Sequence, residues 1–238
     1  TELCIKFLLF RSTAIHFFME TSILQSIKSN LTYFFTNPRT FSIGLIFAAE
    51  SALFAAWLSR IALIKESMQL SDEQLGILLF GLPLGLLLLN PFSGMIVGRL
   101  NVPKTLLLSG FMCSFSLLVP AFAPNIYILF VGLMLLGASS ALANVAMNTC
   151  VTILEKAENI RIMATCHGMW SLGSMLSGLL ASVLIAQNVP TNWHFSGMSL
   201  LIMGIFIFSQ NQLKLVKNPE KTDDMPKEAG FVIPDRNL

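Results

Sequence analysis

One long uncharged stretch decides the fold of this chain. It covers residues 105–154 and reads TLLLSGFMCSFSLLVPAFAPNIYILFVGLMLLGASSALANVAMNTCVTIL, with no Asp, Glu, Lys, Arg or His. About 20 apolar residues of helix cross the hydrocarbon core of a bilayer. The stretch is therefore long enough for two crossings, with the Ala-Pro-Asn turn at residues 123–125 between them. It predicts a pair of membrane-spanning helices.

Other apolar runs raise the expected number of spans to six. Residues 162–213 hold two more, since they contain no Asp, Glu, Lys or Arg and only two histidines. Residues 40–59, broken only by Glu50, and residues 74–98 add one span each. The composition agrees, because 12% charged residues and a mean hydropathy of +0.71 lie far from the average of about 25% charged residues in soluble proteins. The apolar runs are continuous, whereas barrel strands alternate. The sequence thus predicts an all-α integral membrane protein, and its net charge of +2 gives no reason to expect a nucleic acid partner.

Local signals place the ends of several spans. We expect the first span at about residues 41–63. Ser71 and Gln74 have the spacing of a capping box, so the second span starts there. A short basic loop at residues 99–104 follows it, and Pro103 suits the first turn of the third span. Further connections are expected at residues 155–161 and 188–192.

The chain is expected to have three parts. Residues 1–38 form a cytoplasmic N-terminal extension, of which residues 1–18 are interpreted as upstream sequence or fragment context outside the fold. Residues 39–215 form the six-helix domain. Residues 216–238 are rich in Lys, Glu, Asp and Pro and are interpreted as a charged cytoplasmic linker or tail.

The distribution of Lys and Arg predicts the orientation, because cytoplasmic loops carry an excess of these residues. If the spans alternate, Arg60 and Lys65 fall on one side. The other side receives Lys28, Arg39, Arg99, Lys104, Lys156, Arg161, Lys214 and Lys217. We therefore expect a multi-pass protein of the inner (plasma) membrane with both termini in the cytoplasm.

Glu50 is the first candidate for a functional residue. It lies about ten residues into the first span, roughly 15 Å deep at 1.5 Å per residue. Acids at this depth usually face a protein interior or a watery cavity. Trp57 lies two turns further along the same face. The two side chains could hold a polar ligand or a proton. The alternative is a structural Glu50 that is hydrogen-bonded to a neighbouring helix.

Polar groups in the fourth and fifth spans are the other candidates. Asn144 and Asn148 follow Ser140 at four-residue spacing, and Asn144 is expected at about the height of Glu50. His167 and Trp170 belong to the fifth span, and His167 could meet Asn148 near an inner gate. A histidine there could relay protons. The alternative for each of these polar side chains is interhelical hydrogen bonding without a transport role.

The remaining motifs exclude several functions. Glycines at positions 81, 85, 94, 98, 168, 173 and 178 are expected to let helices approach closely. The sequence has no phosphate-binding loop, no Cys/His metal spacing and no nucleophile elbow. We therefore expect neither an enzyme nor a cofactor or metal site.

Several motifs resemble one known family. The chain is similar to the N-terminal half of a major facilitator superfamily transporter. Gly94, Arg99 and Lys104 match part of the Gly-x-x-x-Asp-Arg-x-Gly-Arg-Lys motif that this family carries between its second and third spans. Gly98 stands at the Asp position of that motif and Asn101 at the following Gly. The resemblance implies a cytoplasmic gating role for the three matching residues.

Further stretches resemble a bacterial inner-membrane branch of the family that is close to the fucose–proton symporters. They are residues 57–76, 144–148 and 167–173. The resemblance implies six helices arranged as 3+3 inverted repeats, one half of a twelve-helix fold, with a solute site near mid-membrane. The symporters' span-four acid falls at Asn144, which cannot titrate, and their span-one acid falls nearer Leu58 than Glu50. Proton coupling therefore requires Glu50 to act from a displaced position.

Two functional hypotheses follow. The first is a secondary transporter of a small polar solute, sugar-like by analogy and proton-coupled, of which this chain is the N-terminal half. Its partners are the solute, the lipid bilayer and a C-terminal six-helix half in the same or a separate chain. The second is a six-helix assembly or binding protein that pairs with a second half or with itself and transports nothing alone.

Overall fold

The computed structural model describes residues 25, 27–214 and 216, and these residues contain helices and no strands. Six helices in this part are long and apolar enough to cross a membrane, which confirms the predicted number of spans. They are α2 (Pro38–Ser67), α3 (Asp72–Leu100), α4 (Val102–Phe122), α5 (Ile126–Glu158), α6 (Met163–Ala186) and α7 (Thr191–Leu213). A shorter helical segment, residues 27–36, precedes α2.

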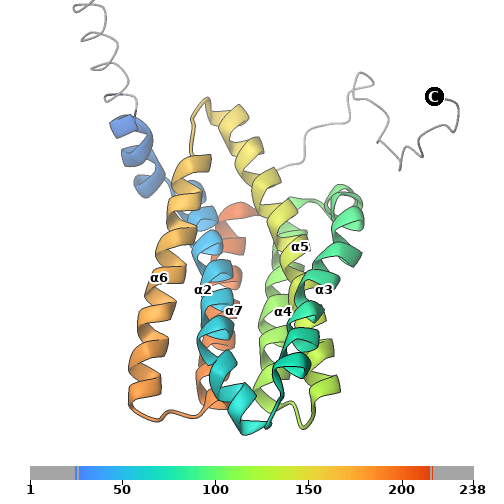
Figure 1. The fold of residues 1–238 in the computed structure, drawn as a ribbon. Helices are drawn as coiled ribbons and strands as arrows, with labels where there is room; N and C mark the ends of the chain where they lie inside the picture. Colours follow the sequence, from blue (N-terminus) through green and yellow to red (C-terminus); the bar gives the residue numbers. More distant parts are fainter. Residues whose placement is uncertain (1–24, 26, 215, 217–238) are drawn as a thin grey trace, which may run out of the picture.

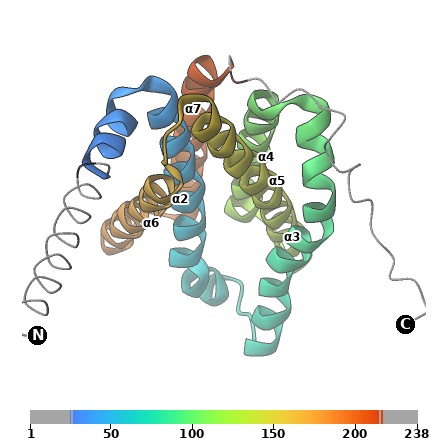
Figure 2. The ribbon, with the colours of Figure 1, turned by 90° about the horizontal axis from the view of Figure 1, so that it is seen from above.

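The helices form one bundle with a repeated packing pattern (Figures 1 and 2). Helix α2 packs on α6 and α7, and α5 packs on α3 and α4. Exchanging α2 with α5, α3 with α6 and α4 with α7 turns each of these pairs into another. The pair α4–α7 joins the two groups and is unchanged by the exchange. The first three helices (α2–α4) and the last three (α5–α7) are thus two triplets with equivalent packing, as the inverted-repeat prediction requires.

Glycines bring helix backbones together within both groups. A Cβ atom added to Gly85 of α3 would lie 1.8 Å from the carbonyl oxygen of Met134 in α5. The equivalent pair of the other group has Gly173 of α6 against Ala48 of α2, where the added Cβ would lie 2.2 Å from the carbonyl oxygen. No other residue fits at either position without moving a backbone.

Four other glycines do not have the packing role that we expected. Added Cβ atoms at Gly94, Gly98, Gly168 and Gly178 would have no neighbour within 4 Å. These positions lie on surfaces of α3 and α6 that the described residues leave open.

Most caps agree with the sequence. The capping box is confirmed, since Ser71 Oγ accepts from the N–H of Gln74 and Gln74 Oε1 accepts from the N–H of Ser71. Helix α5 extends further than expected, to Glu158. Its last turn is hydrogen-bonded to the start of α6. Glu155 Oε1 accepts from the N–H groups of Ile162 and Met163, at 2.6 and 2.9 Å.

The expected basic loop between the second and third spans is shorter than predicted. Gly94 and Arg99 lie in α3 and Lys104 lies in α4, so Asn101 alone separates the two helices. Asn101 has φ 67° and ψ 162°, a backbone region that glycine adopts readily and other residues rarely. This geometry explains why a glycine suits that position of the family motif. The Asn101 side chain compensates in part, since its Oδ1 accepts from the N–H of Lys104 at 3.2 Å.

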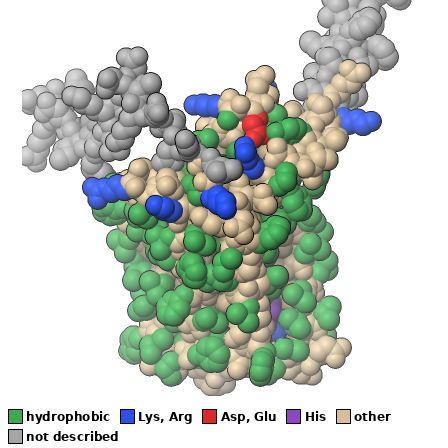
Figure 3. All heavy atoms as spheres, turned by 180° about the vertical axis from the view of Figure 1, so that it is seen from behind, with side chains coloured by type: hydrophobic (Ala, Val, Ile, Leu, Met, Phe, Trp, Pro, Cys, Tyr) green, Lys and Arg blue, Asp and Glu red, His purple; other side chains and the backbone are tan. Residues whose placement is uncertain are grey.

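Charged side chains gather at one end of the bundle (Figure 3). Figure 1 places the segment of residues 27–36, the α3–α4 junction, the α5–α6 connection and the end of α7 at that end. Of the nine Lys and Arg residues in the described part of the chain, only Arg60 and Lys65 belong to the other end. The structure thus keeps the charge asymmetry on which the predicted orientation depends.

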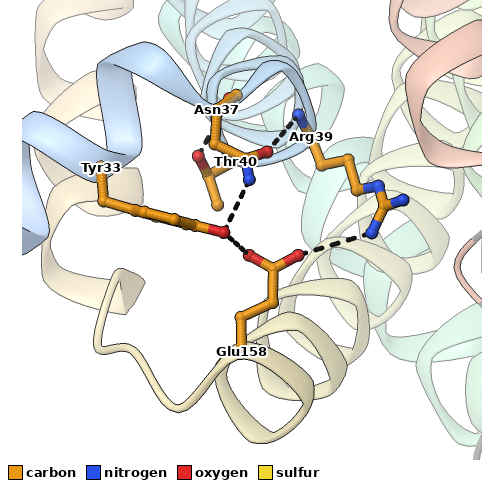
Figure 4. Close-up of polar contacts among 5 residues, drawn as sticks. All are labelled: Tyr33, Asn37, Arg39, Thr40 and Glu158. Atoms are coloured by element: carbon orange, nitrogen blue, oxygen red, sulfur yellow. Dashed lines mark hydrogen bonds and ion pairs between the residues drawn. The ribbon is translucent and has the colours of Figure 1, made fainter.

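A polar cluster fastens the segment of residues 27–36 to this charged end (Figure 4). Tyr33 donates to Glu158 at 2.5 Å, and Glu158 also pairs with Arg39 at 3.5 Å. Asn37 Nδ2 donates to the Tyr33 hydroxyl at 2.7 Å. The hydrogen bond to Glu158 raises the pKa of the Tyr33 phenol, so this group stays protonated and remains a donor near neutral pH. The cluster joins the start of α2 to the end of α5.

The glycine contacts give a prediction for stability. Replacing Gly85 with Ala should lower the free energy of unfolding by about 1–3 kcal/mol, because the new methyl group overlaps the α5 backbone. Gly94→Ala in the same helix is the matched control, since it meets nothing within 4 Å and gains helix propensity. Thermal unfolding in detergent measures both variants. Equal unfolding temperatures would contradict the packing described for α3 and α5.

Candidate functional site

A buried carboxylate at the junction of three helices forms the candidate site. Glu50 of α2 is only 6% exposed. Its Oε1 accepts from Ser140 Oγ of α5 at 2.8 Å, and its Oε2 accepts from Trp170 Nε1 of α6 at 2.9 Å. We call Glu50, Ser140 and Trp170 the acid cluster.

The packing of α2 explains how the cluster forms. Helix α2 lies against α6 along the Gly173 contact, which brings Trp170, one turn before it, next to α2. Ser177 of α6 adds a hydrogen bond to the carbonyl oxygen of Ala52 at 2.7 Å. Glu50 therefore lies between two contacts of α2 with α6, at Ala48 and at Ala52, and α5 contributes Ser140.

The acid cluster contains no cation. In the described part of the chain, the only ion pairs are those of Arg39 with Glu158 and of Lys65 with Asp72. Glu50 is held by two neutral donors, a hydroxyl and an indole N–H. Such donors can satisfy a carboxylate, and the Ser140 hydroxyl can turn to accept from a protonated acid. The arrangement can thus hold Glu50 in either protonation state without a change of partners.

Trp170 is the more exposed member of the hydrogen bond that it forms with Glu50. Its side chain is 39% exposed, whereas Glu50 is almost completely covered. Part of Trp170 is thus exposed, while its indole N–H donates to the acid. This contact joins two residues that the sequence proposed separately, but the sequence did not predict that they touch.

The two asparagines lie on the neighbouring part of α5. Asn144 is exposed and Asn148 is half-buried. Asn148 Nδ2 donates to both Oδ1 and the carbonyl oxygen of Asn144, each at 3.0 Å. The residue that meets Glu50 is Ser140, one helical turn before Asn144. The amides therefore lie beside the acid cluster, toward the charged end of the bundle.

His167 and Trp57 occupy different surroundings. The exposed His167 ring packs edge-on against Phe47, with ring centroids 5.4 Å apart, and the described residues include no hydrogen bond between it and Asn148. Trp57 is buried at 1% exposure and lies 6.4 Å from the Phe195 ring of α7. The structure does not bring Trp57 together with Ser140 and Trp170, the hydrogen-bond partners of Glu50. A ligand role for His167 or Trp57 stays a prediction.

Sequence reasoning missed a second polar cluster near the other end of α2. Arg60 Nε donates to Nδ1 of His194 in α7 at 3.1 Å, and Arg60 Nη1 donates to the carbonyl oxygen of Val189 at 3.0 Å. His194 was visible as one of two histidines in the run of residues 162–213. The pairing itself requires knowledge of how α2 and α7 pack.

The described residues contain no group of three or more His, Cys, Asp or Glu side chains that could hold a metal ion. The side chains of the acid cluster themselves can hold a proton or exchange hydrogen bonds with a polar group.

Comparison with known proteins identifies a family and several relatives. The family described as Major Facilitator Superfamily matches residues 39–232. An uncharacterized MFS-type transporter of Yersinia pestis is 26% identical over 175 residues, which are 73% of this chain and 45% of that protein. An uncharacterized transporter of Sinorhizobium fredii is 25% identical over 159 residues, 67% of this chain and 42% of that protein.

A third relative is the membrane protein MosC of Rhizobium meliloti. It is 26% identical over 170 residues, which are 71% of this chain and 40% of that protein. The chain thus spans less than half the length of each of these relatives. No solved structure matches it.

The acid cluster gives a prediction for stability. Trp170→Phe keeps an aromatic ring but removes the N–H that Glu50 accepts, so it should lower the free energy of unfolding by about 1–2 kcal/mol. Trp193→Phe is the matched control, because Trp193 is 72% exposed. Thermal unfolding in detergent, followed by circular dichroism, compares the two variants. A Trp170 variant as stable as the Trp193 variant would show that the hydrogen bond contributes nothing.

Proposed function

Because this chain belongs to the Major Facilitator Superfamily, we propose that it is the N-terminal six-helix half of a secondary active transporter. The solute is small, polar and sugar-like, and it moves together with protons. The observation that carries the proposal is the acid cluster. A carboxylate inside a transmembrane helix is costly, and such residues commonly mark proton relays or solute pathways.

Glu50 is the proposed proton-carrying group. Its two hydrogen bonds come from neutral donors on two other helices, so a change in its charge acts on contacts between α2, α5 and α6. Ser140 can accept or donate, which allows Glu50 to take up a proton while it remains hydrogen-bonded. This supports coupling through an acid that is displaced along span one from the position used by the fucose–proton symporters.

Polar side chains that are exposed or half-buried on α5 and α6 support a solute with several hydroxyl groups. Asn144, Asn148 and His167 offer donors and acceptors, and Trp170 offers a partly exposed ring. Ligand sites combine apolar surface with a few polar groups in this way. Trp57 is proposed to support the site from behind, where it packs between α2 and α7.

The same polar surface supports a second six-helix half as partner, in the same or a separate chain. Amide side chains on a transmembrane helix are poorly tolerated against lipid and face a protein interior or a watery cavity. Only 17% and 22% of the 18-residue apolar windows of α3 and α6 are buried, and these two helices are the second helices of their triplets. A partner half that contacts both would enclose the acid cluster between the halves.

The charged end of the bundle is proposed to face the cytoplasm, in the inner membrane, with both termini on that side. The positive-inside tendency supports this orientation. The junction at Asn101 then lies on the cytoplasmic side, where Gly94, Arg99 and Lys104 take part in gating. Their exposure on α3 and α4 leaves them free to contact a partner half.

The alternative is a six-helix assembly or binding protein that transports nothing by itself. The largely unburied apolar windows of α3 and α6 support it, because they offer a surface for pairing. Two measurements separate the two functions. The first is solute uptake, measured for the chain alone and for the chain produced with a downstream six-span segment. The second is crosslinking of the chain to identical chains. Uptake that never appears in either form, together with self-crosslinking, would favour the alternative.

The proton-coupling proposal is tested with Glu50→Gln, which keeps the size and hydrogen-bonding capacity of the side chain but cannot titrate. In vesicles that contain the complete gene product, an imposed pH gradient should no longer drive accumulation of a sugar substrate. Exchange of labelled for unlabelled solute, which needs no net proton movement, should persist.

Glu73→Gln provides the matched control. Glu73 lies exposed in the first turn of α3, away from the acid cluster, and its variant should behave as the wild type. A Glu50→Gln protein that accumulates solute with an unchanged pH profile would overturn the proposed role of this acid.

A further inference from the structure

The second polar cluster, at the less charged end of the bundle, has an unbalanced charge. Arg60 is 2% exposed and His194 is 3% exposed. The Arg60 guanidinium donates to His194 and to the carbonyl oxygen of Val189, both of which are neutral acceptors. No carboxylate pairs with Arg60 among the described residues, where the only ion pairs lie elsewhere.

Two buried nitrogens of this cluster also lack partners. Within the described part of the chain, Nη2 of Arg60 and Nε2 of His194 have no hydrogen-bond acceptor or donor. A buried charge without a counter-charge is strongly destabilising, and buried polar atoms are normally satisfied. The described residues therefore leave the charge and the hydrogen-bonding groups of this cluster without full compensation.

A groove adjoins the cluster. It has a volume of about 520 Å³, and Arg60 and Val189 form part of its lining together with the first residue of α7, Thr191. Helix α7 begins after Pro190 without a side-chain cap. No side chain in the described ranges accepts from the N–H groups of Thr191, Asn192 or Trp193. Free N–H groups and the helix dipole make such a start attractive to anions.

Arg60 and the α7 start are thus two independent features that favour negative charge at the same groove. Charged residues near the groove limit the charge of the ligand that it can bind. Lys65 is engaged by Asp72, so it does not add to the positive charge. Glu66 also lines the groove and opposes a multiply charged ligand.

We propose that this groove binds a small oxyanion group, a carboxylate or a singly charged phosphate. One oxygen pairs with the Arg60 guanidinium, and the α7 N–H groups hold another. The site is separate from the acid cluster, because Arg60 lies ten residues beyond Glu50, roughly 15 Å along the helix. Bound there, the anion ties α2 to the start of α7. The oxyanion comes either from solution or from the headgroup of a membrane phospholipid.

The test measures thermal unfolding of the purified protein with defined probes. In detergent, acetate and inorganic phosphate at pH 6 are compared with chloride at equal ionic strength. In nanodiscs, phosphatidylglycerol is compared with phosphatidylcholine. Saturable stabilisation by acetate or phosphate in detergent identifies a soluble anion as the ligand. Stabilisation by phosphatidylglycerol alone identifies a lipid headgroup.

Three variants assign the effect to the groove. Arg60→Gln should weaken binding about tenfold or more, since hydrogen bonds to charged groups contribute about 1.5–3 kcal/mol. Glu66→Gln, at an exposed position, should tighten binding. Thr191→Pro removes one N–H at a helix position that favours proline, so it should weaken binding while α7 remains intact.

The last two variants keep the proposal testable if Arg60→Gln does not fold. The proposal is overturned if neither anions nor phosphatidylglycerol stabilise the protein. It is equally overturned if all three variants respond as the wild type does.

Discussion

The structure depends on the close approach of helix backbones at a few glycines. Inside a bilayer, two helices gain little from burying apolar surface against each other, because lipid tails are equally apolar. Close packing and interhelical hydrogen bonds must supply the attraction. Gly85 against Met134 and Gly173 against Ala48 provide this packing, in two helix pairs that correspond to each other when the triplets are exchanged. The pairs α3–α5 and α2–α6 are thereby fixed, and the remaining helices are arranged around them.

The acid cluster is a consequence of this packing. Because α6 lies so close to α2, an indole at position 170 reaches the carboxylate of Glu50, and α5 adds the Ser140 hydroxyl. Each interhelical hydrogen bond contributes little by itself, about 0.6 kcal/mol on average and up to 1–2 kcal/mol. Their importance is that they satisfy a group that lipid could not. The same reasoning makes the unsatisfied nitrogens of Arg60 and His194 notable, since nothing in the described part of the chain does this for them.

The sequence predicted the spans well because span length and charge placement are local properties set by the bilayer. The capping box at Ser71 and the depth of Glu50 also depend only on nearby residues. Contacts between spans could not be predicted in this way, because they depend on how the helices pack. Trp170 and Glu50 were separate candidates, 120 positions apart, and only helix packing shows that they touch. The pair of Arg60 and His194 went unpredicted for the same reason.

The glycines show where local reasoning fails. A small residue permits close approach, but the sequence does not say which side of a helix meets a neighbour. Gly173 is covered by α2, while Gly178, five positions later in the same helix, faces nothing within 4 Å. Likewise, the single-residue junction at Asn101 follows from two helices that continue until they almost meet, whereas the composition of that stretch resembles a loop.

Under the proposed function, the position of Trp170 links a solute to a proton. A solute bound against the 39% exposed indole would lie next to the hydrogen-bond partner of Glu50, which itself is only 6% exposed. Any shift of the ring that accommodates the solute lengthens the N–H contact to Oε2 and leaves that oxygen short of a donor. A buried carboxylate that loses a donor favours the protonated form. Solute binding and proton uptake would then be linked through one hydrogen bond, without any direct contact between the solute and the acid.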